Sequence, residues 1–221
     1  MTLVAKCKGS MAIKAGELAK LTMDTLVTRS IAGVTCTINS DSSDANSNLK
    51  IGAITTALNK INGKGYTLPS AITFYLADGE KVVPGFEAFA SNKAPTKAYA
   101  RDADSNDAAV VFLGRNSVAS DCDLNGVANK LHTFVTGGFT AMVAAHEIGH
   151  LLHEYHSPGV SYGDVNLQGD QISTARHHIS EYASANKLEV VAEVFCAHIF
   201  DWKLSSEADK LYGICNGPPL R

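Results

Sequence analysis

Histidine is confined to one part of this 221-residue chain. All eight histidines lie between His132 and His198, and the first 131 residues have none. Two of them, His146 and His150, belong to a segment that reads HEIGH. On an α-helix, residues four apart lie on one face, about 6 Å apart along the axis. The two imidazoles could therefore bind one zinc ion from a single rigid helix.

Glu147 is the second residue of the same motif. It is rotated by about 100° around the helix axis from the histidine that precedes it. This offset places its carboxylate beside the remaining coordination position of the metal, where it could take a proton from zinc-bound water. We therefore expect Glu147 to be the general base of a hydrolytic zinc site.

A catalytic zinc site needs a third protein ligand, and Glu189 is the preferred candidate. Glu189 and Glu193 lie four residues apart in a predicted helix whose other faces are apolar. Burying two carboxylates is costly unless each has a partner. We expect Glu189 to ligate zinc. We expect Glu193 to accept the other ring N–H of a histidine ligand and so to fix its tautomer.

His156 is the alternative third ligand. It lies ten residues after His146, as in the HExxHxxGxxH pattern of the metzincin proteases. His153 stands where that pattern has glycine, and no methionine follows the motif to form the methionine turn of metzincins. A metzincin-type protease is therefore the second hypothesis.

A deformylase-type site would need an upstream cysteine ligand, for which Cys122 is the nearest cysteine.

The site residues resemble those of the gluzincin zinc peptidases, in particular the anthrax lethal factor catalytic domain and the Pro-Pro endopeptidases. Tyr182, Glu189 and Glu193 match the Y-x6-E-x3-E arrangement of that group. The resemblance covers roughly residues 139–200. It implies a zincin-like fold, and it implies that Tyr182 hydrogen-bonds the oxyanion of the tetrahedral intermediate. Tyr162, in a Gly-rich segment, is a second oxyanion candidate.

Hydrophobic periodicity predicts the elements that position these residues. The expected helices span residues 11–28, 49–61, 139–156, 171–184, 187–200 and 205–212. The expected strands span residues 34–38, 71–77, 96–100 and 108–114. Residues 39–48 and 157–170 have loop composition, and residues 78–95 are expected to be irregular. Strands come mainly first and helices last, which predicts an α+β fold.

The last two predicted strands are expected to form a hairpin around the polar turn RDADSND. Of these, Ala108–Gly114 is the expected edge strand, which would pair with an extended peptide substrate. The whole chain is expected to be one zincin-like catalytic domain. Its N-terminal lobe would cover about residues 1–156, with a small mixed sheet, and its helical C-terminal lobe about residues 157–221.

Composition limits the partners of the protein. The formal net charge is −3, which argues against electrostatically driven binding of nucleic acid. The sequence has no apolar stretch long enough for a membrane span and no secretory signal pattern. We expect a monomer that is exported by a leaderless route, or alternatively a cytoplasmic protein.

The expected activity is zinc-dependent hydrolysis of peptide bonds in a protein or peptide substrate that binds in extended form. A secreted or delivered bacterial toxin or effector is one setting for this chemistry. A non-catalytic module that binds zinc or a partner protein is the alternative from a different class. Glu147 argues against that alternative, because a structural zinc site has no use for a general base.

Overall fold

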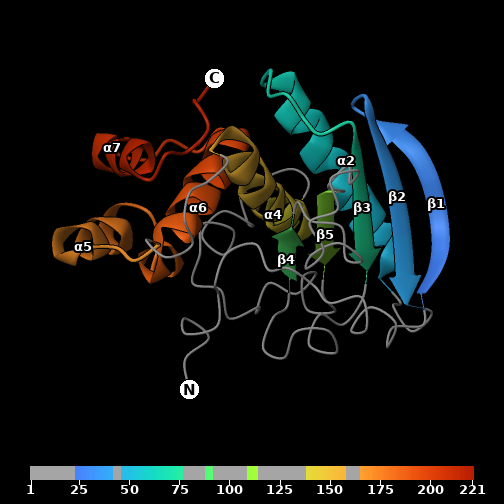
Figure 1. Cartoon of the computed structure of the whole chain (residues 1–221), viewed down its shortest axis with the longest axis horizontal. Coiled ribbons are helices and arrows are strands. Elements are labelled where there is room, and N and C mark those ends of the chain that lie inside the picture. The colour runs from blue at the N-terminus through green and yellow to red at the C-terminus, as the bar shows by residue number, and fades with distance from the viewer. Residues whose placement is uncertain (1–22, 42–45, 77–87, 92–108, 114–137, 158–164) are drawn as a thin grey trace, which may run out of the picture.

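The computed structural model describes residues 23–41, 46–76, 88–91, 109–113, 138–157 and 165–221 (Figure 1). Its strands are β1 Met23–Ile31, β2 Val34–Asp41, β3 Ala71–Leu76, β4 Ala88–Ser91 and β5 Ala109–Leu113. Its helices are α2 Ser47–Gly63, α4 Gly138–His156, α5 Gly169–His178, the 3-10 helix η5 Tyr182–Ala185, α6 Lys187–Ile199 and α7 Ser206–Ile214. The predicted mixed α+β class is confirmed.

The five strands form one mixed sheet with the order β1-β2-β3-β5-β4. β2, β3 and β5 run parallel to one another, whereas β1 and β4 are antiparallel to their single neighbours. α4 contacts β4, β5 and α2 on one side and α6 on the other. Figure 1 shows the sheet at one end of the molecule and α5 and α7 at the other, with α4 and α6 between them.

The apolar core explains why these elements stack. The buried positions of α2 recur every three or four residues, and its apolar ones are Ala53, Ile54, Ala57, Leu58 and Ile61. They share one continuous core with alternate residues of β2 and β3 and with most of α4 and α6. α4 lies in the middle of this core. A surface helix buries one apolar stripe, but a central helix such as α4 is buried around nearly its whole circumference.

The predicted helix 11–28 is wrong over its last residues, because β1 begins at Met23. The segment is rich in Thr and other β-branched residues, which suit a strand. Ala32 and Gly33 join β1 to β2 with φ angles of 53° and 81°, as a two-residue hairpin requires. Pairing with β1 also extends β2 to Asp41, into the predicted loop. Residues 11–22 lie outside the described residues.

The predicted edge strand is also wrong. β5 lies between β3 and β4, so among the described strands the edge on this side is β4. β4 falls in the segment expected to be irregular, because four residues are too few to show the period of a strand. The predicted hairpin partner, residues 96–100, lies outside the described residues.

The other predicted helices are confirmed with small shifts at their ends, with one exception. The predicted helix 171–184 is two elements, because α5 ends at His178 and η5 follows at Tyr182. Ile179 leaves the helical region, with φ −121° and ψ −84°. In the described part of the chain, no helix has the length and apolar character needed to cross a membrane.

Candidate metal centre

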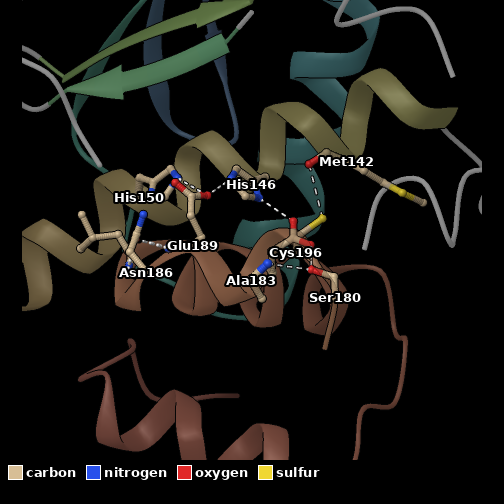
Figure 2. Close-up of polar contacts among 10 residues, drawn as sticks. Met142, His146, His150, Ser180, Ala183, Asn186, Glu189 and Cys196 are labelled. Atoms are coloured by element: carbon tan, nitrogen blue, oxygen red, sulfur yellow. Dashed lines mark hydrogen bonds and ion pairs between the residues drawn. The ribbon is translucent and has the colours of Figure 1, made fainter. Parts of the chain in front are cut away.

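α4 carries both histidines of the HEIGH segment on the face that meets α6. His146 and His150 are buried, with 6% and 8% of their surface exposed. Their rings are one turn apart and pack edge to face, with centroids separated by 4.9 Å. Figure 2 shows both side chains between the two helices, facing Glu189. The helix therefore brings the two imidazoles together as their spacing predicts.

The start of α6 is held by Asn186, which orients the first turn of the helix. The Asn186 side chain accepts hydrogen bonds from the backbone N–H groups of Leu188 and Glu189, at 2.9 and 3.1 Å. This is an N-cap, which satisfies backbone donors that have no partner within the helix. The cap places Glu189 in the first turn, where the helix dipole favours a negative charge.

Glu189 reaches both histidines. Its Oε2 lies 3.2 Å from His146 Nε2 and 3.5 Å from His150 Nε2. One ligand atom from each of the three residues lies within 4.8 Å of the other two. All three side chains are buried. Together, His146, His150 and Glu189 could hold a metal ion.

Glu193 lies one turn further along α6 and contacts the opposite side of the His146 ring. Its Oε1 is 2.9 Å from His146 Nδ1. Its Oε2 accepts a hydrogen bond from the Ser180 hydroxyl at 2.7 Å. With its proton on Nδ1, the His146 ring donates a hydrogen bond to Glu193 Oε1 in this contact. The Nε2 atom is then free to face the candidate metal site.

The donor set fits a cation. With one proton on Nδ1, a neutral His146 directs the Nε2 lone pair at the carboxylate of Glu189, so a proton or a metal ion must lie between them. Burial by itself lowers the pKa of His146, but hydrogen bonds with Glu189 and Glu193 outweigh burial and raise it well above its usual range. Two imidazoles and a carboxylate are also a ligand set that zinc accepts.

The charge of Glu189 is stabilised by the same contacts. Burial opposes ionisation of this carboxyl, but the neighbouring His150 and His146 hold its pKa below the usual range. Glu189 is therefore ionised at neutral pH, which is the state that a metal ligand requires.

Glu147 has the opposite shift. Its carboxyl is buried on α4, and burial raises its pKa. The negative charge of Glu189 adds to this increase, whereas His146 and His150 oppose it. A carboxyl whose pKa is raised toward neutrality is suited to take up and release a proton.

Tyr182 begins η5 and lies next to the potential metal ligand His146. Its ring centroid is 5.7 Å from that of His146, with an angle of 39° between the planes. The side chain is half-buried. The structure thus brings Tyr182 to the same histidine that Glu189 and Glu193 contact.

The other sequence candidates are placed elsewhere. His156 is exposed at the end of α4 and does not belong to the group of potential ligands found among the described residues. His153 is buried, and its Nε2 has no hydrogen-bond partner among the described residues. Tyr162 and Cys122 lie outside the described residues.

Sequence reasoning missed two residues that support the site, Asn186 and Ser180. An asparagine directly before an apolar helical segment is an N-cap signal, so Asn186 could have been found from the sequence. No sequence signal marks Ser180, because its contact with Glu193 depends on how η5 packs against α6.

Cys196 lies on α6 and is a buried thiol. It donates to the Met142 carbonyl at 3.4 Å, and burial raises its pKa well above the usual range.

Comparison with known proteins gives no functional assignment for this chain. No protein-family model matches the chain, and no curated protein matches it. The spacing of the residues and the geometry of the buried group are therefore the grounds for the proposal that follows.

Proposed function

We propose that this protein is a zinc-dependent endopeptidase of the gluzincin type, with a zincin-like fold. The observation that carries this proposal is the buried group of His146, His150 and Glu189, with the carboxylate of Glu147 on the same helix. Three protein ligands leave a coordination position open, as catalytic zinc sites do, whereas structural sites are closed by four ligands. A buried general base beside the ligands has a use only in the catalytic case.

Each remaining residue of the site has a role in peptide hydrolysis. A zinc ion held here would polarise the scissile carbonyl and increase the acidity of a water molecule. Glu147 would accept the proton of the attacking water and then donate it to the leaving amine. Tyr182 would donate a hydrogen bond to the oxyanion of the tetrahedral intermediate. Glu193 would keep His146 in the tautomer that leaves Nε2 available.

The substrate that suits this arrangement is a peptide in extended form. β4 is the edge strand nearest to α4, and no strand among the described residues pairs with its outer side. An extended peptide could add to that edge through main-chain hydrogen bonds, which is a common way to bind an unfolded segment. β4 would thus take the role of substrate-binding edge that the sequence assigned to residues 108–114.

The biological setting that we propose is a monomeric bacterial toxin or effector that cleaves a target protein. The resemblance of residues 139–200 to the lethal factor and Pro-Pro endopeptidase group supports this setting. Mapping of cleavage sites in a proteome, with the Glu147→Ala variant as the inactive control, would identify the target and its sequence preference.

The activity is tested by measuring metal content and peptide hydrolysis together. We expect the purified protein to contain about one zinc ion per chain. We expect it to cleave casein or a peptide library, to lose this activity with a chelator, and to regain it with Zn²⁺. Glu147→Ala should keep the metal and lose hydrolysis, because only the proton acceptor is removed.

A matched control is Glu207→Ala, which removes an exposed glutamate from α7. This variant should hydrolyse peptides at the wild-type rate. Hydrolysis that persists in Glu147→Ala would exclude Glu147 as the base. Zinc binding without hydrolysis in the wild-type protein would instead support a non-catalytic zinc-binding module.

A further inference from the structure

Ser180 is completely buried between the end of α5 and the start of η5. Its Oγ accepts a hydrogen bond from the backbone N–H of Ala183 at 2.9 Å. Its hydroxyl proton is donated to Glu193 Oε2 at 2.7 Å. The hydroxyl has one proton and a carboxylate can only accept, so the direction of this second bond is fixed. Figure 2 shows Ser180 beside Ala183, close to the metal ligands.

The other carboxylate oxygen of Glu193 extends this series of hydrogen bonds to the candidate metal site. Oε1 is 2.9 Å from His146 Nδ1, and the Nε2 of that ring faces Glu189 at 3.2 Å. The side chains of Ser180, Glu193 and His146 are all buried. Hydrogen bonds between buried groups are stronger than exposed ones, and leaving one unpaired costs more.

We propose that Ser180 is a positioning residue for the metal centre. It holds the carboxylate of Glu193 against His146. Through Ala183, it also ties the short helix that carries Tyr182 to the same carboxylate. This inference rests on the metal site of the proposed function, but it does not depend on peptide hydrolysis.

Loss of the Ser180 hydroxyl should weaken metal binding. Glu193 would keep His146 Nδ1 as a partner, but Oε2 would lose its buried donor, so the carboxylate could rotate away from the imidazole. Loss of a group that orients a metal ligand typically weakens metal binding by about 10–100-fold. Because Ser180 acts through Glu193, we expect the lower end of this range.

The experiment compares Zn²⁺ affinity in the full chain of the wild type and of Ser180→Ala, by competition with a chromophoric chelator. We expect Ser180→Ala to raise the Kd for Zn²⁺ by about tenfold. We also expect the visible absorption bands of the Co²⁺-loaded protein to shift, because the His146 imidazole is less well held. Circular dichroism of the metal-free proteins reports whether both are folded.

Ser184→Ala is the matched control. Ser184 belongs to the same 3-10 helix, and its exposed hydroxyl donates to the Glu181 carbonyl, away from Glu193. This variant should bind Zn²⁺ with wild-type affinity. Ser180→Thr keeps a hydroxyl at the same position and should recover most of the affinity lost in Ser180→Ala.

A double-mutant cycle separates positioning from a general loss of packing. If Ser180 acts through Glu193, then Ser180→Ala should weaken Zn²⁺ binding little further once Glu193→Ala is present. Additive losses, or unchanged Zn²⁺ affinity in Ser180→Ala, would overturn the positioning role even if the melting temperature falls. Wild-type protein that binds Zn²⁺ without cleaving peptides would overturn only the peptidase proposal. Wild-type protein that binds no Zn²⁺ would overturn both.

Discussion

Glu189 and Glu193 are one helical turn apart, yet they contact opposite nitrogens of the same imidazole. Glu189 faces His146 Nε2, and Glu193 faces Nδ1. Glu189 Oε2 also reaches His150 Nε2, at 3.5 Å. Two residues of one type on one helix therefore have different surroundings, because the His146 ring lies between them with one nitrogen toward each carboxylate. Under the proposed function, Glu189 is the metal ligand and Glu193 orients His146.

The choice of third ligand can be tested by metal affinity. Glu189→Ala removes the carboxylate from the buried group, so we expect zinc affinity to fall by more than about 100-fold, beyond the effect of losing an outer partner. His156→Ala changes an exposed side chain and should leave the affinity unchanged. Isothermal titration calorimetry with Zn²⁺ measures both. The reverse order of effects would favour the metzincin hypothesis.

Tyr182→Phe tests the proposed oxyanion contact. The variant keeps the ring that packs beside His146 and removes only the hydroxyl. Loss of one oxyanion donor typically lowers kcat by about 10²–10³-fold. We expect a decrease of this order, with zinc content and KM near their wild-type values. An unaltered kcat in steady-state peptide hydrolysis would contradict the role.

His153 should make stability dependent on pH. Burial, followed by the nearby His150, lowers its pKa from 6.5 to about 4, against a smaller opposing hydrogen bond with the Cys215 backbone. The unfolded chain therefore binds more protons than the folded chain between pH 6.5 and about 4, so stability falls as the pH falls through this window. One pKa unit corresponds to about 1.4 kcal/mol, so the loss attributable to this residue is about 3 kcal/mol.

Urea unfolding of metal-free protein at pH 7 and at pH 4.5 measures this effect. His153→Leu removes the titrating group and leaves the other histidines in place. The difference in unfolding free energy between the two pH values should therefore be smaller in His153→Leu than in the wild type. Equal differences in the two proteins would show that other groups cause the pH dependence.

At the scale of elements, the site depends on how closely α4 and α6 approach. The two helices pack tightly at Gly149, inside the HEIGH segment. A Cβ atom at Gly149 would lie 2.9 Å from Phe195 Cδ1 and 3.4 Å from Ala192 Cα. Phe195 is completely buried, so it has little room to move. The small residue between the motif glutamate and the second histidine thus sets the distance between the helices that carry the ligands.

Gly149→Ala should separate α4 from α6 and weaken both stability and zinc binding. Overpacking of a core contact typically costs about 1–3 kcal/mol. Gly52→Ala is the matched control, because Gly52 is exposed within α2 and a Cβ there meets nothing within 4 Å. That control should stabilise the protein by about 0.5–1 kcal/mol. Denaturant unfolding of the two variants should move the midpoint in opposite directions.

At the scale of the whole molecule, the candidate site joins two layers of the fold. α4 contacts the sheet, whereas α6 contacts α7 on the far side (Figure 1). The three potential ligands come from both α4 and α6. A metal ion bound by residues of both helices would bind the folded chain only. Metal binding and folding are then thermodynamically coupled.

Removal of the metal should therefore lower the melting temperature. A ligand at 100 times its Kd stabilises the folded state by about 2.7 kcal/mol, which corresponds to a shift of roughly 5–10 °C for a chain of this size. Differential scanning calorimetry with chelator and with added Zn²⁺ measures this shift. Glu189→Ala should show no such response to zinc, and an equal response in that variant would place the stabilising metal elsewhere.

Much of the helical fold follows from local patterns. The sequence predicts the ends of α2, α4, α6 and α7 to within a few residues, because each helix has an apolar repeat of helical period. The strand errors have a different origin. β4 is too short to show a strand period, whereas β1 has strand-forming residues whose signal is outweighed by a helical apolar spacing; pairing with β5 and β2 completes these two strands.

The sequence by itself determined which residue types could form the site, since a helix with a period of 3.6 residues places His146 and His150 on one face. The tertiary structure alone decided that the histidine facing Glu193 is His146, that Ser180 donates to Glu193, and that β4 lies at the edge of the sheet formed by the described strands. The physical reason is range. Helical periodicity acts over four residues, whereas the contact between His146 and Glu193 spans 47 positions and exists only after α4 and α6 have packed.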